Sequence, residues 1–468
     1  MKKFNRVIAT AIAVLVLSSS VACTSKTETT TAAPGDSSVA AQTTVSDTTK
    51  TAASDTAPAT GEPVSIKVDV QPFASPQSLP AIGELIAQFE KDNNIKVELT
   101  VSVNDDPYRI KLLQDVVAGN AADVAFIDGS WLPEFDALDA LVPLDKWAND
   151  EFKSKFIDFA SEGATLDGQL KAIWFSTGSA GLYYRKDLLE AAGYTAPPKT
   201  WSELSEMAKN LTVDSNNDGN VDRYGFSFPG KKEVVSTFTM YPFLWGNTGA
   251  EMTRDGKVAF GTGADKEAML KTLTYLQSLI QDGSVSKDTP SIGFVDIESN
   301  FIGDQCAMAI MGSWQYASIK TNAGEEFANN VGIAPLPYPD ENGAPVACAG
   351  GWTMAMFTKD TAKQDAAWKF MEFWSTSEVQ KILTQSGQLT TLKSVYEDPD
   401  ITKDTTTIDF YNILLNGKTR DAVAYQGMMD LQFQGLLQSA AMLTEDMSTA
   451  IDTAAATTIK EAEAAGVY

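Results

Sequence analysis

Residues 168–189 of the chain read GQLKAIWFSTGSAGLYYRKDLL, and this stretch decides how the chain is divided. An apolar, aromatic run at 173–175 gives way to small residues at 176–179, and a second apolar run follows at 181–184. Two strands joined by a small, flexible link have this pattern. It suits a chain that crosses between two lobes with a ligand between them. Two core strands joined by an ordinary loop would give the same pattern.

Strand and helix patterns alternate before this stretch. The spacing of apolar residues predicts strands and helices in turn at 64–70, 82–89, 95–101, 108–116 and 123–127. This order indicates an α/β fold with mostly parallel strands. Ligands bind at the carboxyl ends of such strands, where the loops at 73–80 and 128–131 lie.

The pattern continues after the stretch, with more helix toward the end. Strands are predicted at 306–311 and 346–357, and helices at 201–211, 266–280, 365–384 and through most of 407–466. Thr200 with Glu203 predicts a capping box at the first of these helices. Trp201, Trp368 and Trp374 lie on helices, and we expect them in the core.

The composition excludes several classes of function. The chain has 468 residues, too many for one compact core, which predicts two domains. Its net charge of -25 repels phosphate backbones, so we expect no nucleic-acid partner. It contains no histidine, which excludes Ser-His and Cys-His nucleophiles and the usual zinc sites.

The first residues predict an export signal. Three cations among the first six residues precede an apolar run at 7–17 that is too short to span a bilayer as a mature helix. Cys23 follows Ala22 as at a bacterial lipoprotein cleavage site, although Ser20 stands where that pattern prefers a larger aliphatic residue. We favour lipidation of Cys23 over ordinary cleavage near Ala22. The predicted signal peptide is therefore 1–22.

A low-complexity segment follows the predicted cleavage site. Residues 24–62 contain no Leu, Ile, Phe, Tyr or Trp. Such a segment buries too little apolar surface to fold. We expect residues 23–62 to be a disordered linker that tethers the folded body to its lipid anchor.

Five segments together resemble one protein family, in the family's order. They are IGELIAQFEKDNNIKVELTV at 82–101, VAGNAADVAFIDGSWLPEF at 117–135, GLYYRKDLLEAAGYTAPPKTWSELSEMAKNL at 181–211, AMAIMGSWQYASIK at 307–320 and AAWKFMEFWSTSEVQKILTQSGQ at 366–388. Nearly everything after Val64 is similar to the extracellular solute-binding proteins of bacterial ABC importers, in the maltose-binding-like, sugar-binding group. Arg185 departs from the family, which more often has Asn there.

This resemblance implies a two-lobed, periplasmic-binding-protein-like α/β fold. Each lobe would be a mixed sheet flanked by helices, with the ligand in the cleft between the lobes. The resemblance implies that the chain crosses between the lobes near 175–178, 335–339 and 397–401. The expected division is an N-terminal lobe at 63–176 plus 337–396 and a C-terminal lobe at 177–336 plus 397–468.

Aromatic and polar residues near strand ends are the candidate ligand contacts. Indole rings stack on the apolar C–H faces of sugars, while carboxylates, amides and backbone groups pair with hydroxyls. The candidates are Asp128, Trp131, Phe175, Trp245, Trp314, Gly351 and Trp352. The resemblance implies that Trp131 and Trp314 face the cleft. Trp245 and Trp352 suit a core equally well, Asp128 also suits a helix cap, and the glycine also suits a bulge.

A polar loop at 214–222 has the spacing of a calcium-binding loop. The candidate ligands are the side chains of Asp214, Asn216, Asp218 and Asp222 and the carbonyl of Asn220. Gly225 stands where an EF-hand has its bidentate glutamate, so a strict EF-hand is excluded. We expect structural calcium slightly ahead of the alternative, which is a solvated Asn/Asp turn.

Cys306 and Cys348 leave two interpretations open. In an exported protein they could form a disulfide. Two buried free thiols fit the sequence about as well.

These observations predict a receptor that does no chemistry. We expect a monomer, touching the membrane through its lipid anchor alone, that captures a mono- or oligosaccharide by lobe closure and delivers it to the permease subunits of an ABC importer. No cofactor for activity is expected. The alternatives are an exported carbohydrate-active enzyme with paired carboxylates and a surface adhesin that binds polysaccharide.

Overall fold

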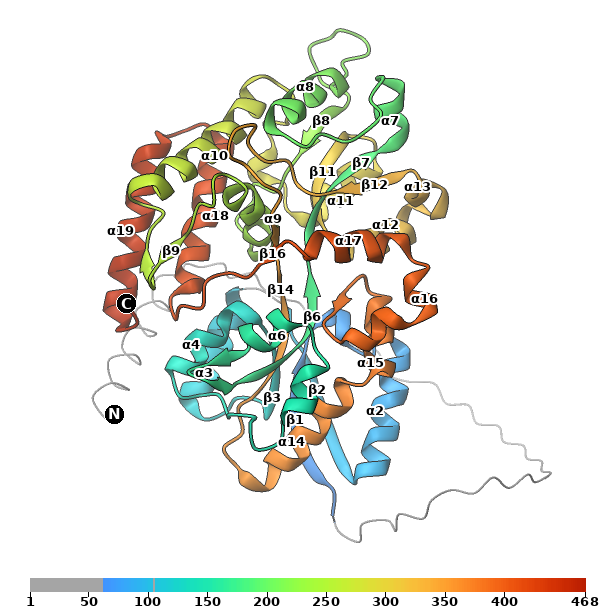
Figure 1. Ribbon diagram of the computed structural model, residues 1–468, viewed down its shortest axis with the longest axis vertical. Coiled ribbons are helices and arrows are strands. Elements are labelled where there is room, and N and C mark those ends of the chain that lie inside the picture. The colour runs from blue at the N-terminus through green and yellow to red at the C-terminus, as the bar shows by residue number, and fades with distance from the viewer. Residues whose placement is uncertain (1–61, 104–105) are drawn as a thin grey trace, which may run out of the picture. The chain divides into compact units, whose positions relative to one another are not determined.

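The computed structural model describes residues 62–103 and 106–468. The predicted signal peptide, the lipidation site Cys23 and the linker up to residue 61 lie outside the described residues. The described chain forms two α/β lobes, each built on its own sheet, as the resemblance implied (Figure 1). The prediction of a two-lobed fold with mixed sheets is therefore confirmed.

The first lobe is built on a six-stranded sheet in the order β15-β6-β14-β3-β1-β2. Its strands are β1 (Val64–Val70), β2 (Ile95–Val101), β3 (Val124–Asp128), β6 (Ala172–Gly178), β14 (Gly350–Met356) and β15 (Leu389–Thr390). β1 pairs in parallel with β2 and β3, whereas β14 and β15 pair antiparallel with their neighbours. The strands β1, β2 and β3 are parallel, as the alternation of strand and helix patterns before residue 128 predicts. The sheet becomes mixed because β14 returns from the second lobe and runs the opposite way.

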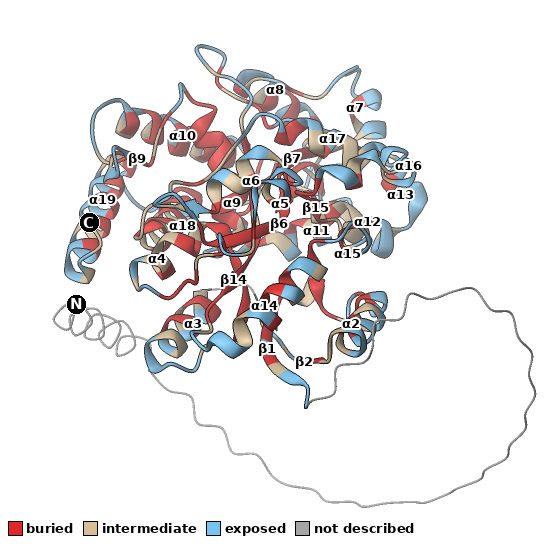
Figure 2. Cartoon of the chain, turned by 60° about the horizontal axis from the view of Figure 1, so that its bottom comes forward, coloured by how far each residue is buried: buried red, intermediate tan, exposed pale blue. Residues whose placement is uncertain are grey.

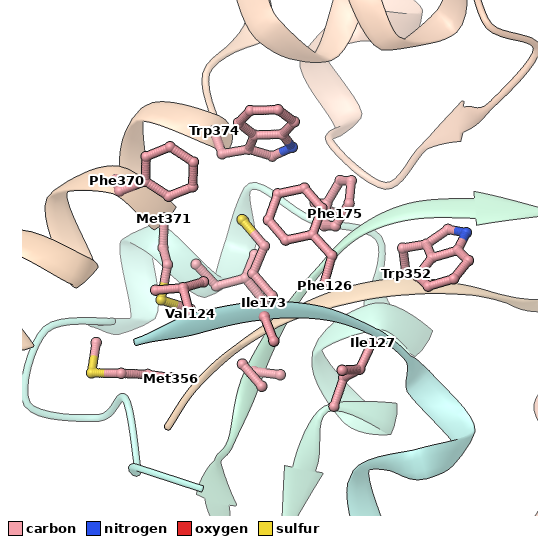
Figure 3. Close-up of a cluster of buried hydrophobic side chains, with 14 of the residues drawn as sticks. Val124, Phe126, Ile127, Ile173, Phe175, Trp352, Met356, Phe370, Met371 and Trp374 are labelled. Atoms are coloured by element: carbon pink, nitrogen blue, oxygen red, sulfur yellow. The ribbon is translucent and has the colours of Figure 1, made fainter. Parts of the chain in front are cut away.

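Helices cover both faces of this sheet. They are α2 (Pro80–Asn93), α3 (Asp106–Ala118), α4 (Leu132–Ala137), α5 (Asp150–Ser154), α6 (Asp158–Gly163), α14 (Thr361–Trp374), α15 (Ser377–Thr384) and α16 (Pro399–Thr402), with 3-10 turns η1 (Pro72–Ala74), η2 (Gly129–Trp131) and η4 (Lys393–Glu397) and a hairpin of β4 (Thr165–Leu166) and β5 (Gln169–Leu170). Phe126 of β3 and Phe175 of β6 pack edge-on against Trp374 of α14, with ring centroids 5.0 and 6.3 Å apart (Figure 3). This aromatic cluster joins the sheet to its main covering helix.

The second lobe is built on a four-stranded sheet in the order β12-β7-β11-β8. Its strands are β7 (Ala180–Arg185), β8 (Tyr224–Ser227), β11 (Cys306–Gly312) and β12 (Val331–Ala334). The shorter pairs are β9 (Thr253–Arg254) with β10 (Lys257–Val258), and β13 (Ala347–Cys348) with β16 (Gly417–Lys418). Its helices are α7 (Lys186–Ala191), α8 (Trp201–Leu211), α9 (Val234–Trp245), α10 (Gly263–Gln281), α11 (Phe294–Ile302), α12 (Trp314–Ala323), α13 (Glu325–Asn329), α17 (Thr405–Leu414), α18 (Gln426–Met442) and α19 (Met447–Ala465), with η3 at Thr289–Ser291.

The stretch at 168–189 contains the first passage between the lobes. β6 is buried at every residue and ends at Gly178, and β7 begins in the other sheet at Ala180. Figure 2 shows the buried strands in red inside helices whose outer faces are exposed. The small residues between the apolar runs therefore stand where the chain changes sheets.

The other two passages lie later than the family resemblance implies. The segment 337–349, expected in the first lobe, packs on the second: Trp201 Nε1 donates to the carbonyl of Pro337 at 3.1 Å. The chain returns to the first sheet only at Gly350, where β14 starts. The prolines of this segment mark a loop laid over α8 rather than the crossing itself. Ile401 of α16 still packs on the first-lobe core, and α17 belongs to the second lobe.

Several local predictions are confirmed. Thr200 accepts a hydrogen bond from the Glu203 amide and Glu203 from the Thr200 amide, which completes the capping box of α8. The helix-borne Trp201, Trp368 and Trp374 are all buried. Of the helices in the described residues, none is long and apolar enough to span a bilayer.

The contact between β8 and α8 leads to a stability prediction. A Cβ built on Gly225 would lie 1.8 Å from the carbonyl oxygen of Ala208, which is backbone and has no side chain to move aside. We expect Gly225→Ala to lower the free energy of unfolding by about 3 kcal/mol, at the upper end of overpacking effects. Urea unfolding followed by circular dichroism measures this change.

The matched control is Gly435→Ala on α18. A Cβ there meets only the flexible end of Lys232, at 3.9 Å. This variant should gain about 0.5–1 kcal/mol, because alanine favours helix over glycine. Equal stability of the two variants would contradict the close β8–α8 packing.

Candidate functional site

A cavity of about 340 Å³ lies between the lobes. It is bordered by residues at the carboxyl ends of β1, β3 and β6 and at the start of β14. Since β14 runs opposite to β3, its first residues lie at the same edge of the sheet as the last residues of β3. A cavity of this size, at the strand ends of an α/β sheet, is typical of small-molecule sites.

The first lobe supplies the polar side chains that line the cavity. They are Gln71, Asp128, Ser386 and Gln388. Gln71 donates through Nε2 to the Phe126 carbonyl at 3.1 Å, while its buried Oε1 has no partner among the described residues. Gln388 accepts through Oε1 from the Ser176 hydroxyl at 3.0 Å, which orients the amide. Gln71 Oε1 is thus a buried acceptor at the cavity wall without a hydrogen-bond partner among the described residues.

Aromatic rings from both lobes meet at the cavity. Trp352 of β14 packs against Phe73 of η1, with centroids 5.7 Å apart. Trp314, the first residue of α12, packs against Phe238 of α9 at 5.8 Å. One aromatic pair therefore belongs to each lobe, and these pairs offer faces for an apolar ligand surface.

Gly351 lines the cavity and also sits at an irregularity of the sheet. Its φ of 152° lies outside the usual range for other residues, and a Cβ there would lie 2.3 Å from the Ser176 carbonyl. The pairing of β14 with β6 shifts register between Trp352 and Thr353. The glycine therefore permits both the bulge and the close approach of the two strands.

Asp128 joins the cavity to the opposite lobe. Its Oδ1 accepts from the Ser130 amide at 2.9 Å and the Ser130 hydroxyl at 2.7 Å, which caps η2. The same oxygen accepts from Arg420 of the second lobe at 2.5 Å. Asp128 is therefore a cap, a lobe-to-lobe contact and a lining residue at once.

The Arg420 guanidinium is buried between two carboxylates. Besides Asp128 it contacts Asp430 of α18 at 3.1 Å, and Asp430 also accepts from Tyr241 at 2.8 Å and Gln426 at 2.9 Å. Burial opposes the charge on Arg420, but the two carboxylates outweigh it and raise the pKa of Arg420. Burial raises the pKa of Asp430, although Arg420 acts against it. Arg420 is thus the shared cation of both Asp128 and Asp430.

Residues 84–407 match the family described as bacterial extracellular solute-binding protein, which covers most of the chain. The chain belongs to this family. Its members bind solutes, and the cavity between the lobes is large enough for a small molecule.

Individual relatives agree with that assignment. A protein of Brucella abortus named as a binding protein is 28% identical over 316 residues, spanning 66% of this chain and 71% of the relative. The maltotriose-binding protein of Pyrococcus abyssi is 25% identical over 297 residues, 62% of this chain and 59% of the relative. Maltose-bound MalE3 of T. maritima has a TM-score of 0.73 at 24% identity, covering 85% of this chain and 99% of that structure. The structural likeness supports the two-lobed fold.

The structure brings four of the predicted contacts to the cavity and leaves three in the core. Asp128, Trp314, Gly351 and Trp352 line the cavity. Trp131 is 2% exposed and packs toward Tyr108, Phe175 is fully buried against Phe126, and Trp245 is 4% exposed and stacks on Tyr241. The N-terminal part of α9, up to Phe238, borders the cavity. Trp245 lies two turns further along the helix and does not reach it.

Sequence reasoning missed other lining residues. Gln71 and Phe73 directly follow β1, at the strand end where ligands bind in α/β sheets. Their position in the sequence could therefore have identified them as lining residues. Phe238, Phe294 and Gln388 had no such signal, because each reaches the cavity only through the packing of the folded lobes.

The loop at 214–222 binds its own backbone. Asp214 accepts from the Gly219 amide at 2.9 Å, Asp218 from the Asn220 amide at 2.7 Å and Asp222 from the Ser215 amide at 2.7 Å. The described residues contain no group of three or more His, Cys, Asp or Glu side chains arranged to hold a metal ion. This geometry is that of a solvated Asn/Asp turn, and calcium binding by these residues and Asn216 stays a prediction.

Cys306 and Cys348 are both free, buried thiols in the structure. Burial raises the pKa of each to about 12. They are therefore neutral and unreactive at physiological pH.

The Arg420 cluster leads to a second stability prediction. Arg420→Met leaves Asp128 and Asp430 buried without their cation, and removing one partner of a buried ion pair typically costs about 3–5 kcal/mol. We expect Arg420→Met to lower the free energy of unfolding by that amount, as measured by urea unfolding at pH 7. Adding Asp430→Asn to Arg420→Met should recover part of it.

Lys320→Met is the control, because Lys320 pairs with Glu325 and both side chains are more than half exposed, at 53% and 74%. Exposed pairs contribute less than about 1 kcal/mol. Equal urea midpoints for Arg420→Met and Lys320→Met would contradict the prediction that the buried cluster stabilises the fold.

The calcium prediction is tested by thermal unfolding. If the loop at 214–222 holds structural calcium, the melting temperature should fall when EDTA replaces millimolar CaCl₂, because a ligand of the native state stabilises it. Asp214→Asn with Asp218→Asn should abolish that difference. An unchanged melting temperature in the original protein would remove the calcium site.

Proposed function

We propose that this chain captures a neutral mono- or oligosaccharide outside the cell and delivers it to the permease of an ABC importer. The observation that carries this proposal is the lining of the cavity between the lobes. Trp314 and Trp352 offer aromatic faces, while Gln71, Asp128 and Gln388 offer groups that pair with hydroxyls. Apolar C–H faces with hydroxyls at the rim are the chemistry of a sugar.

The charges of the lining favour an uncharged ligand. Among the described lining residues, Asp128 is the single carboxylate and none is basic. An acidic sugar would lack a cation to pair with, and a polyamine would meet one carboxylate already engaged by Arg420. Relatives support the same class, since the named ligands include maltotriose for the P. abyssi protein, and maltose and α-D-tagatose for solved neighbours.

Lobe closure would couple binding to transport. A ligand that touches both lobes stabilises the closed arrangement relative to the open one, and the population shifts accordingly. The closed form then docks on the permease. Lipidation at Cys23, which lies outside the described residues, would keep the receptor at the outer face of the membrane.

The enzyme alternative finds little support in this cavity. Glycoside hydrolysis uses two carboxyl groups at a fixed separation. The described lining residues provide one, and its Oδ1 is occupied by Ser130 and Arg420. Turnover of a labelled oligosaccharide would nevertheless overturn the receptor proposal.

The function is tested by calorimetry of a panel of neutral saccharides, with Trp314→Ala as the variant. Loss of the stacking surface should weaken binding about 10- to 100-fold, equivalent to about 1.4–2.8 kcal/mol. Trp147→Ala is the control, because Trp147 stacks on Trp368 in the first lobe and lies outside the cavity lining. Small-angle scattering should show compaction on adding the bound sugar.

Two results would contradict the proposal. One is binding of amino acids, peptides or polyamines with no binding of any saccharide. The other is saccharide binding that Trp314→Ala and Trp147→Ala leave equally unaffected.

A further inference from the structure

The two lobes contribute unlike surfaces to the cavity. Gln71, Asp128, Ser386 and Gln388, the lining residues with amide, carboxyl or hydroxyl side chains, all come from the first lobe. The second lobe contributes Val234, Val235, Phe238, Phe294 and Trp314, whose one polar side-chain group is the indole N–H of Trp314. A ligand in this cavity therefore has hydrogen-bonding partners on one side and an apolar wall on the other.

The apolar wall is continuous. Val234 and Val235 precede Phe238 by four and three residues on α9, so the three side chains share one face of that helix. Phe238 packs against Trp314 at 5.8 Å. Phe294 begins α11, and its amide donates to Glu233 at 2.6 Å, which holds the start of α11 beside the start of α9.

The carboxylate next to this wall is engaged elsewhere. Glu233 immediately precedes α9, and its oxygens lie 2.7 Å from where a Cβ on Gly293 would be. The group accepts from the Phe294 amide and so serves the N-terminus of α11. Glu233 is absent from the cavity lining.

We infer that the ligand is a neutral saccharide with an apolar substituent, such as a deoxy carbon or an O-linked hydrophobic group, on the side that faces the second lobe. The inference rests on the proposed function and narrows its substrate class. The Trp314–Phe238 pair covers a ring face, and Val234, Val235 and Phe294 receive the substituent. A hydroxyl placed there would lose its water without gaining a side-chain partner.

The test is calorimetry with matched sugar pairs. The probes are 6-deoxy hexoses against their parent hexoses, and phenyl against methyl glycosides of the same sugars. The member with the apolar group should bind about tenfold tighter or more in at least one pair. Val234→Thr with Val235→Thr should shrink that preference, because the side-chain volume is kept while hydroxyls enter the wall.

Val117→Thr is the matched control. Val117 of α3 is 52% exposed and lies outside the cavity lining, so its replacement should leave the preference unchanged. Saccharides that bind with equal or better affinity when they lack the apolar group would overturn the inference and leave the proposed function standing. A panel in which no saccharide binds would overturn the proposed function itself.

Discussion

The contact on which the two-lobed arrangement depends is the burial of Arg420 between Asp128 and Asp430. The Arg420 guanidinium forms an ion pair with one carboxylate from each lobe, and the Arg420 side chain is 2% exposed. A buried ion pair gains roughly what its groups lose in hydration, so it adds little net stability on its own. Its effect is on geometry, because any arrangement that separates the lobes must bring water to all three charges.

This geometry places the binding chemistry at the seam between the lobes. Asp128 uses one oxygen both to cap η2 and to meet Arg420, and it also borders the cavity. The first lobe therefore lines the cavity with polar side chains at a sheet edge, and the second lobe lines it mainly with apolar ones. Under the proposed function, the first lobe would select by hydrogen bonding and closure would add the burial of apolar surface.

The sequence predicts the fold better than it predicts the site. Apolar spacing and the five family-like segments identify the lobes, and the small residues after Phe175 mark the first crossing. The tripeptide Gly-Ser-Trp occurs at both Trp131 and Trp314. The first tryptophan packs toward Tyr108 in the core and the second toward Phe238 at the cavity. Identical local sequences therefore have different roles, because the neighbours supplied by distant segments decide which face is covered.

The most direct test of the proposed binding mode is a crystal structure of the protein with a neutral saccharide bound. We expect the sugar in the cavity between the lobes, with hydroxyls within hydrogen-bonding distance of Gln71 or Gln388 and an apolar face on Trp314. We expect the side of the sugar that faces Val234 and Phe294 to carry no hydroxyl. A ligand bound outside this cavity, or one held there by charged contacts, would contradict the proposed binding mode.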